Sequence, residues 1–419
     1  MGTSGKTPHV VILGGGFGGL AAARALSRAP VRLTLIDRKN HHLFQPLLYQ
    51  VAAAALNPSD IATPIRRILR RQKNVTVILD KAIAIDVAQK RVCLADGTID
   101  YDFLIVATGA THAYFGHPEW ARAAPGLKTI EDALEIRRRL LSAYEAAERE
   151  TDLERQRAWM TFAIVGAGPT GVELAGALAE ISRQVLARDF RRIDPRAARI
   201  VLVEAGPRVL PTFAPDLSQR AADQLRRLGV EVRMGTAVTT IDEHGLALGD
   251  ERIEAKTVLW AAGVAASPIA QSLGVPLDRA GRVRVEPTLA VPGAPDVYVI
   301  GDLAAVSQAA GQVPGVAQGA IQGGRHAAKN ILNTLVGRPR VAFCYRDLGS
   351  LATIGRAAAV AQFSRVHLSG FIAWLAWLFI HLMLLIGFRN RFLVLTEWAW
   401  TYFTRDHGAR LITGSERES

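Results

Sequence analysis

Two glycine-rich stretches are the parts of this sequence best suited to chemistry. Residues 10–24 read VVILGGGFGGLAAAR, and residues 162–176 read FAIVGAGPTGVELAG. Each is an apolar run, then G-x-G-x-x-G, then small residues that can start a helix. In such a turn the first glycine permits the bend, the second lets the backbone approach a pyrophosphate, and the third lets the helix pack on the strand. Each stretch therefore predicts one dinucleotide site.

An acidic residue ends the next predicted strand after each stretch. Asp37 follows residues 31–36, and Glu204 follows residues 201–203. A carboxylate placed there can hold the ribose hydroxyls of a nucleotide. Glu204 would also repel a 2′-phosphate, so the second site is expected to prefer NADH to NADPH, an inference that the nearby Arg208 weakens. The residues predicted for the two sites are Gly14, Gly16, Phe17, Gly18, Gly19 and Asp37, and Gly166, Gly168, Pro169, Thr170, Gly171 and Glu204.

The elements that position these residues repeat at the scale of a domain, which predicts an α/β fold with two Rossmann-like domains. Each half has the turn, the acid, and a strand ending in A-x-G, at 107–109 and 261–263. The strand expected at 297–300 follows both halves, so the second domain is inserted into the first. The expected domains are 1–130 with 265–345, the inserted domain 131–264, and a C-terminal region 346–419. Single helices are expected at 61–71, 131–155 and 315–335.

The C-terminal region contains two apolar runs, 370–388 and 392–403, with four tryptophans. As a helix the first run would be about 28 Å long, nominally enough to cross a bilayer. His381 at its middle disfavours a simple span, while apolar side chains all round disfavour a purely surface helix. The residues alone leave both arrangements open.

Composition excludes several other classes of site. The two cysteines, Cys93 and Cys344, form no C-x-x-C motif, so neither a dithiol redox centre nor a cysteine-rich metal site is expected. His41 and His42 lack a third ligand at metal spacing, so no metal is expected. The net charge of +12 favours an anionic partner, but the basic residues are scattered without base-stacking aromatics, so nucleic acid is not expected. The start MGTSGKTPH lacks the apolar segment of a signal peptide.

Six stretches together carry a family resemblance that covers nearly the whole chain. They are NHHLFQPLLYQVA (40–52), GPTGVELAGALAE (168–180), LWAAGV (259–264), YVIGDLA (298–304), AQGAIQGG (317–324) and GFRNRFLVLTEWAWTYF (387–403). They resemble the type II NADH dehydrogenases, which are single-chain, non-pumping NADH:quinone oxidoreductases of respiratory membranes. The resemblance implies a flavoprotein that passes electrons from NADH through FAD to a membrane quinone.

The resemblance also implies further site residues. The additional nucleotide contacts that it implies are Arg38, Gln45, Ala82, Ala107, Thr108, Gly109, Gly263, Gly301, Asp302 and Ala317. Gln318 and Gln322, which share one helix face at i and i+4, would contact the flavin edge and a quinone carbonyl. Glu173 would help to handle protons, against the alternative of a helix-terminal acid stabilised by the macrodipole. Phe44 and Tyr49 are expected to be packing residues.

By the same resemblance the chain is monotopic, docked on the cytoplasmic face of the inner membrane by its C-terminal helices. Arg365, Arg389, Arg391 and Arg405 flank the apolar runs and would reach anionic lipid. A basic face in 61–71 is a second candidate for lipid contact, and a homodimer remains open. Two alternatives are kept: a flavoprotein reductase of another acceptor, such as ferredoxin or a sulfide-derived substrate, and a flavin-bound signalling protein.

Overall fold

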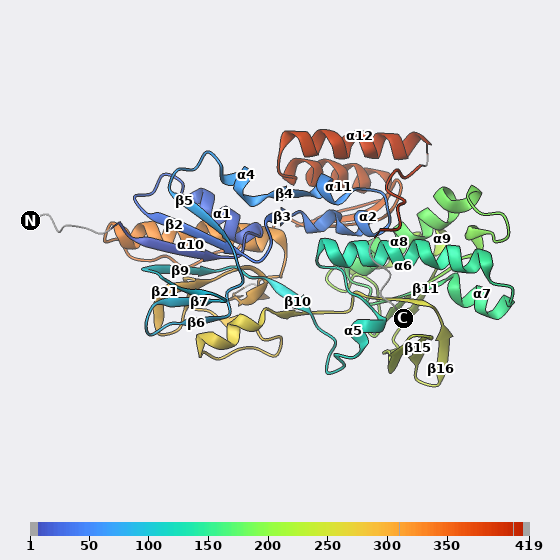
Figure 1. Ribbon diagram of the computed structural model, residues 1–419, viewed down its shortest axis with the longest axis horizontal. Coiled ribbons are helices and arrows are strands. Elements are labelled where there is room, and N and C mark those ends of the chain that lie inside the picture. The colour runs from blue at the N-terminus through green and yellow to red at the C-terminus, as the bar shows by residue number, and fades with distance from the viewer. Residues whose placement is uncertain (1–6, 310, 405, 414–419) are drawn as a thin grey trace, which may run out of the picture. The chain divides into compact units, whose positions relative to one another are not determined.

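The computed structural model describes residues 7–309, 311–404 and 406–413 and divides the chain into two compact units (Figure 1). The first unit comprises Met1–Leu43, Ala62–Thr111 and Val264–Asp347. The second comprises Phe44–Ile61, His112–Gly263 and Leu348–Ser419. Each unit therefore contains one glycine-rich stretch, and the apolar C-terminal region belongs to the second unit by its contacts.

The first unit is built on a six-stranded sheet in the order β20-β21-β9-β1-β2-β5, parallel except for the pair β20 and β21. The strands are β1 (His9–Leu13), β2 (Arg32–Asp37), β5 (Val75–Leu79), β9 (Phe103–Val106), β20 (Ala290–Val291) and β21 (Ala294–Val299). All residues of β1 and β9 are buried, as expected for central parallel strands. Helices α1 (Phe17–Ala25) and α10 (Ala317–Leu335) lie side by side in this unit (Figure 1).

Shorter elements complete the first unit. They are β3 (His41–Leu43), β4 (Ala62–Pro64), α4 (Ile65–Leu69), β6 (Ala84–Asp86), β7 (Arg91–Leu94), β8 (Gly97–Asp100), β18 (Val264–Ala266), η5 (Pro268–Leu273), β19 (Val283–Arg284), η6 (Gly301–Leu303), β22 (Ala304–Ala305), β23 (Ser307–Gln308) and β24 (Gly311–Gln312), and β10 (Ala110–His112) runs into the second unit.

The prediction of a single helix over 61–71 is wrong. Pro64 has ψ 129° and stands before α4, because its extended backbone cannot continue a helix.

The second unit contains a parallel four-stranded sheet in the order β13-β12-β11-β17. These strands are β11 (Thr161–Val165), β12 (Arg199–Glu204), β13 (Val230–Met234) and β17 (Thr257–Trp260), and a small antiparallel sheet holds β14 (Thr240–Asp242), β15 (Gly245–Leu248) and β16 (Glu251–Glu254). The helical elements are η1 (Gln45–Leu47), α2 (Leu48–Ala52), α3 (Pro58–Ile61), α5 (Trp120–Ala123), α6 (Ile130–Arg149), α7 (Leu153–Trp159), α8 (Pro169–Glu180), η2 (Ile181–Val185), η3 (Leu186–Arg188), η4 (Pro195–Ala197) and α9 (Pro215–Arg227).

The helix expected over 131–155 is two helices. Thr129 and Asp132 form a capping box that starts α6. Asp152 then accepts hydrogen bonds from the backbone N–H groups of Glu154 and Arg155, so a second helix begins there.

The C-terminal part of the second unit begins with an antiparallel sheet of β25 (Ser350–Gly355), β26 (Ala358–Phe363) and β27 (Val366–Ser369). Helices α11 (Phe371–Leu384) and α12 (Phe388–Thr404) follow, with Gly387 at φ +94° between them. Ala359 and Ala361 of β26 pack against Ala373 of α11. Among the described residues, the helices are each too short or too polar to cross a bilayer. The apolar run 370–388 is thus not one continuous helix, because α11 begins at Phe371 and ends at Leu384.

Candidate active site

The first glycine-rich turn has a geometry that only glycine permits at two of its positions. Gly14 has φ +100°, and a Cβ on it would collide with the carbonyl of Ala107. A Cβ on Gly19 would overlap the Gly14 carbonyl oxygen. A Cβ on Gly16, in contrast, would meet none of the described atoms within 4 Å. The turn is therefore tight against the sheet on one side and open at Gly16, where a phosphate could approach.

Asp37 fastens this turn to the end of β2. Its Oδ2 accepts the Gly15 N–H at 2.5 Å, and its Oδ1 accepts the Lys39 N–H at 2.7 Å. Each carboxylate oxygen retains a lone pair for a further donor such as a ribose hydroxyl.

The second turn repeats this arrangement. Gly166 has φ +100°, and a Cβ on Gly171 would overlap the Gly166 carbonyl. Glu204 Oε2 accepts the Ala167 N–H at 2.7 Å, and its Oε1 accepts the Gly206 N–H at 2.8 Å. Gly168 is open, as Gly16 is, within the described part of the chain. Pro169 and Thr170 are exposed in the first turn of α8.

Two buried polar atoms beside the first turn fit a bound flavin nucleotide. His42 Nδ1 lies 3.1 Å from the Gly15 carbonyl, so this nitrogen carries the proton. Burial lowers the pKa of His42 to about 4, which leaves the ring neutral and Nε2 an acceptor. Neither His42 Nε2 nor Thr108 Oγ1 has a hydrogen-bond partner among the described residues. A ligand with hydroxyl donors and acceptors, as FAD has, would satisfy both atoms.

Other predicted residues of the first unit lie around the same sheet edge. Gly109 and Gly301 both have φ +68°. Asp302 lies close to Gly315, which precedes α10: its Oδ1 would be 3.3 Å from a Cβ placed on that glycine. Arg38 is exposed and Ala82 is half-buried.

The two glutamines of α10 differ in their partners. Gln322 Nε2 donates to the Arg346 carbonyl at 2.9 Å, and its Oε1 accepts the Arg346 N–H at 3.0 Å. Gln318 is half-buried and makes no hydrogen bond within the described residues. Of the two amides, that of Gln318 is therefore fully available to a ligand. Ala317, which opens α10, is half-buried.

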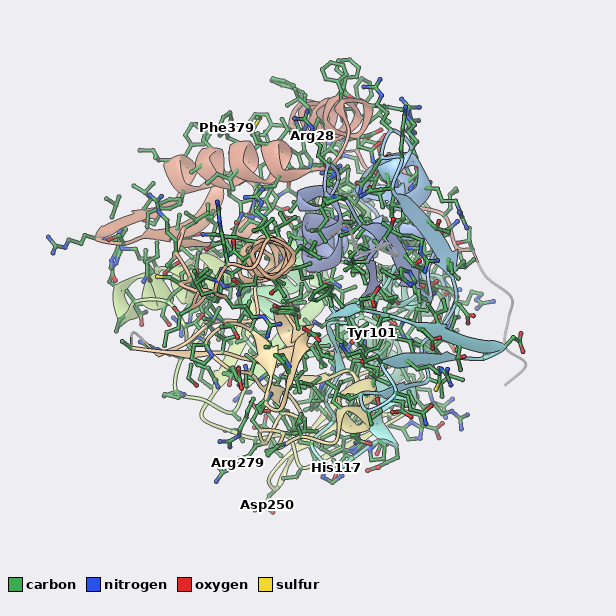
Figure 2. The ribbon with its side chains drawn as sticks, turned by 90° about the vertical axis from the view of Figure 1, so that its left-hand side faces the viewer. Arg28, Tyr101, His117, Asp250, Arg279 and Phe379 are labelled. Atoms are coloured by element: carbon green, nitrogen blue, oxygen red, sulfur yellow. The ribbon has the colours of Figure 1, made fainter. Side chains whose placement is uncertain are left out.

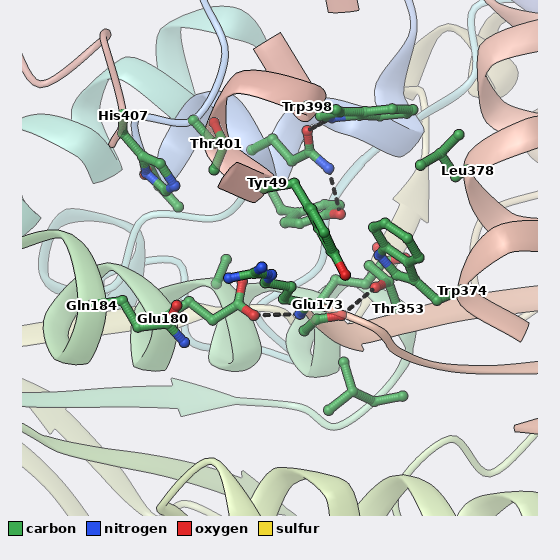
Figure 3. Close-up of a pocket in the computed structure, with 18 of the residues that line it drawn as sticks. Tyr49, Glu173, Glu180, Gln184, Thr353, Trp374, Leu378, Trp398, Thr401 and His407 are labelled. Atoms are coloured by element: carbon green, nitrogen blue, oxygen red, sulfur yellow. Dashed lines mark hydrogen bonds between the residues drawn. The ribbon is translucent and has the colours of Figure 1, made fainter. Parts of the chain in front are cut away.

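The second unit holds a pocket with a cavity of about 120 Å³ (Figure 3). Helix α8 contributes Glu173 and Glu180, which are seven residues apart and so share one face of the helix. The other lining residues used below are Tyr49, Gln50, Thr353, Arg356, Trp374, Trp377, Trp398, Tyr402 and His407. The pocket is thus acidic on one side and aromatic on the other.

Burial changes the acidity of both glutamates. It raises the pKa of Glu173 to about 8, although the Thr353 N–H and the Trp377 indole oppose the rise. The Trp377 indole nitrogen makes no hydrogen bond of normal geometry with any described residue. Burial also raises the pKa of Glu180 to about 7, opposed by the Arg356 N–H and the Arg356 charge. Both side chains keep some surface open to the pocket, so they can exchange protons with water inside it.

Comparison with known proteins decides the family. The chain is 48% identical to the type II NADH:quinone oxidoreductase Ndh of Mycobacterium tuberculosis over 97% of this chain and 91% of that protein. The chain belongs to the type II NADH:quinone oxidoreductases. It is also 48% identical to NdhA of the same organism, over 97% of this chain and 89% of that protein. The type II NADH dehydrogenase resemblance seen in the sequence is therefore confirmed.

Further matches agree with the fold of a type II NADH:quinone oxidoreductase. Residues 8–324 match the family described as pyridine nucleotide-disulphide oxidoreductase, and residues 348–406 match the NDH2 C-terminal domain. The solved structure of NDH2 from Plasmodium falciparum in complex with NADH has a TM-score of 0.90 at 20% identity, covering 98% of this chain and 100% of that one. The predicted α/β fold is confirmed.

In this type II NADH:quinone oxidoreductase the predicted catalytic residues fall in different units. Glu173 belongs to the second unit, and Gln318 and Gln322 belong to the first. Their joint action therefore stays a prediction. Gln45 is exposed in the second unit, with Nε2 3.5 Å from the Lys128 carbonyl, and a Cβ on Gly263 would lie 2.5 Å from the Phe115 ring.

Sequence reasoning missed Glu180 and assigned Tyr49 to packing, yet both line the pocket with Glu173. The spacing of Glu173 and Glu180 in GPTGVELAGALAE, two helical turns apart, is the one signal that could have paired them. Tyr49 carries no such signal, because its place depends on how residues 44–61 fold into the second unit. Among the described residues no cluster of three metal-ligating side chains is present.

Proposed function

We propose that this chain oxidises NADH and transfers the electrons through a bound FAD to a membrane quinone, without pumping protons. The observation that carries the proposal is the pair of near-identical nucleotide turns, each fastened by its own carboxylate. When bound, FAD supplies the chemistry of accepting a hydride and passing its electrons on. The chain's own residues bind, orient and manage protons.

The first turn would hold FAD. The open backbone at Gly16 and the N-terminus of α1 suit its pyrophosphate, and Asp37 suits a ribose. His42 Nε2 and Thr108 Oγ1 offer buried hydrogen-bonding atoms beside that turn. Asp302 and the A-x-G segment at 107–109 would line the remainder of the nucleotide.

The second turn would hold NADH, with Gly168 facing the pyrophosphate and Glu204 the ribose. Arg208 donates to the Pro211 carbonyl at 2.7 Å, so its guanidinium is already partly engaged. The charge of Glu204 therefore favours NADH over NADPH. In the first unit, Gln318 would donate to a quinone carbonyl, with Gln322 and Ala317 on the same helix. In the second unit, Glu173 would handle a proton.

The apolar side of α11 and α12 would rest in one leaflet of the membrane. Figure 2 shows Phe379 on α11 at the surface, where it is 64% exposed. The other large apolar side chains exposed on these helices are Phe371, Ile372, Leu375, Met383, Leu384, Phe388, Phe392, Leu395, Trp400 and Phe403. So large an exposed patch is typical of a membrane or protein interaction surface.

Cationic residues would add contacts to anionic lipid. Arg365, in the turn between β26 and β27, and Arg389, in the first turn of α12, are both exposed. Arg391 instead donates to the Leu385 and Met383 carbonyls at 2.8 Å and caps α11, and Arg405 lies outside the described residues. We infer docking on the cytoplasmic face, as one copy or as a homodimer.

An absorbance spectrum of the purified protein tests the function. The flavin band should bleach when NADH is added and return when a menaquinone or ubiquinone analogue follows. A protein that stays colourless after FAD is supplied would contradict the proposal. A spectrum that bleaches with NADH but recovers only with another acceptor would move the assignment to a different reductase.

Vesicle sedimentation tests docking. Phe379→Ser combined with Phe403→Ser should release the protein from vesicles that contain anionic lipid. Val336→Ser is the matched control, because Val336 is 66% exposed but lies after α10 in the first unit. If the double variant still sedimented fully with these vesicles, the basic residues of 61–71 would be the better candidates for membrane contact.

A further inference from the structure

A chain of three hydrogen-bonding side chains fixes the orientation of Tyr49 in the pocket of the second unit (Figure 3). The Trp398 indole N–H donates to Gln50 Oε1 at 2.7 Å. An indole nitrogen can only donate, so the Gln50 atom that faces it must be the oxygen. The Gln50 amide nitrogen then donates to Tyr49 Oη at 2.8 Å.

This orientation leaves the Tyr49 proton to be donated into the pocket. The phenol oxygen already accepts from Gln50, and no described residue accepts the phenol proton. The Tyr49 side chain is only 6% exposed, so the proton cannot turn to bulk solvent. The groups that share the pocket with it are the carboxyls of Glu173 and Glu180, and both raise the pKa of Tyr49 by their charge, after burial itself.

The segment that carries Tyr49 is itself held in place. Arg137 of α6 is buried and donates to the carbonyls of Val51 at 2.8 Å and Leu56 at 2.7 Å. A cavity of about 120 Å³ is large enough for several waters, since about 10–15 Å³ suffices for one. Waters there could bridge the phenol to the two carboxyls.

We propose that Tyr49, Glu173 and Glu180 form one proton relay in this pocket, in which Glu180 takes up a proton and Tyr49 passes it on to Glu173. The inference rests on the proposed function, because quinone reduction needs two electrons and two protons. NADH supplies both electrons and one proton as a hydride, and the second proton comes from water. In the relay Tyr49 gives its proton toward Glu173 and regains one from Glu180, so no charge remains on the phenol.

The surrounding charges give the relay a direction. Arg356, in the turn between β25 and β26, donates its backbone N–H to Glu180, and its guanidinium lies 4.0 Å from the ring centre of Tyr402. This positive charge favours ionised Glu180, whereas Glu173 faces Thr353 and Trp377 and has the higher pKa. A proton therefore moves downhill from Glu180 to Glu173.

The remaining titratable group in the pocket does not compete. His407, which precedes the C-terminal end of the described chain, lies 3.3 Å from the Ala53 carbonyl through Nδ1. Burial lowers its pKa to about 4, so it stays neutral while the glutamates titrate. The titratable and charged groups that line the pocket with Glu180 are thus Glu173 from α8, Tyr49 from α2, Arg356 from the β25–β26 turn, Tyr402 from α12 and His407.

The experiment compares Tyr49→Phe and Glu180→Gln with two matched controls. Tyr144→Phe also removes a buried phenol hydroxyl, one bonded to Ser182 at 2.6 Å outside the pocket lining. Glu148→Gln alters a carboxylate that, like Glu180, accepts backbone N–H groups, here those of Arg191, Arg192 and Ile193. Rates are measured from about pH 6 to 9, for NADH-driven flavin reduction and for quinone reduction separately.

Both relay variants should lower the rate of quinone reduction at least tenfold above about pH 7, and leave flavin reduction by NADH unchanged. The controls should follow the wild type in both half-reactions. Equal quinone rates and an unchanged pH profile in both relay variants would overturn the relay.

An infrared titration separates this proposal from the proposed function. In the wild type two carboxyl signals should disappear as the pH rises through about 7 to 8. Glu180→Gln should remove one of them. Tyr49→Phe should raise the pH at which the Glu173 signal titrates, because the ionised carboxyl loses a hydrogen-bond donor. These signals do not depend on quinone turnover, so an enzyme inactive toward quinones still tests the relay. A wild type without either signal near neutral pH would overturn it.

Discussion

The two nucleotide turns of this protein are near copies, but the helices that follow them have different neighbours. Helix α1 packs on α10, where a Cβ on Gly324 would collide with the Gly18 carbonyl. Helix α8 packs on strand β25, where a Cβ on Gly176 would overlap the Ile354 carbonyl. One helix is therefore locked to a second helix and the other to the C-terminal sheet.

The difference lies in what each helix carries beyond the turn. The sequence of α1, FGGLAAARA, contains no carboxyl group. The sequence of α8, PTGVELAGALAE, contains two, and both line a pocket with residues of α11 and α12. The same phosphate-binding turn can thus serve only to hold a cofactor, or can also connect a nucleotide site to proton-handling groups and to the apolar helices.

The largest expected effect comes from adding one methyl group to each turn. Gly19→Ala and Gly171→Ala both place a Cβ on a backbone carbonyl that cannot move aside, at a cost of about 3 kcal/mol or more locally. Gly19→Ala should give colourless protein. Gly171→Ala should keep the flavin colour and lose bleaching by NADH. The ratio of flavin to protein absorbance checks both.

Gly16→Ala and Gly168→Ala are the controls for that pair, because a Cβ at either position meets no described atom within 4 Å. Their unfolding temperatures should stay close to that of the wild type. If Gly171→Ala removed the flavin and Gly19→Ala did not, the assignment of the two nucleotides to the two units would be reversed.

The next effect concerns the acid that fastens each turn. Glu204→Arg should lower the preference for NADH over NADPH about 10- to 100-fold, or about 1.4–2.7 kcal/mol, because an arginine attracts a 2′-phosphate. The ratio of kcat/KM for the two nucleotides measures the change. Asp37→Asn in the first turn is the counterpart and should lower flavin content without changing this ratio. An unchanged ratio in Glu204→Arg would remove Glu204 from the ribose site.

The two nucleotide turns could be predicted from the sequence, whereas the pocket of the second unit could not. Gly14, Gly19, Gly166 and Gly171 act through the backbone of their own turn, so a local motif is enough to identify the two turns. The pocket is different, because Tyr49, Glu180 and Trp398 come together from distant segments. Only the fold of residues 44–61 with the C-terminal helices creates it, and no local pattern encodes that contact.

A smaller effect should appear in the pH dependence of stability, and only in the second unit. The pKa values of Glu173 and Glu180 are raised to about 8 and 7, so the folded state holds protons that the unfolded state has released. Stability therefore falls as the pH rises above about 4.5, the ordinary pKa of a glutamate, and the fall ends near pH 7 for Glu180 and near pH 8 for Glu173. The slope is at most about 1.4 kcal/mol per pH unit for each carboxyl. Denaturant unfolding at several pH values should show a shallower fall in Glu180→Gln. Parallel curves for variant and wild type would contradict the burial of this carboxyl.

The smallest effect tests the first unit from the acid side. The pKa of His42 is lowered to about 4 by burial, so the unfolded chain binds a proton below about pH 6.5 that the folded chain does not. The contribution of His42 to the free energy of unfolding is fully present above about pH 6.5 and is lost as the pH falls toward 4.

The variant His42→Asn tests this contribution, because it keeps a side-chain N–H for the Gly15 carbonyl but cannot titrate. Between about pH 6.5 and 5.5 its free energy of unfolding should fall by about 1 kcal/mol less than that of the wild type. His381 and His407, whose pKa values are also lowered to about 4, keep their acid effect in both proteins, so the difference between the two curves isolates His42. If the free energy of unfolding fell equally in the variant and the wild type below about pH 6.5, His42 would not be held neutral beside the first turn.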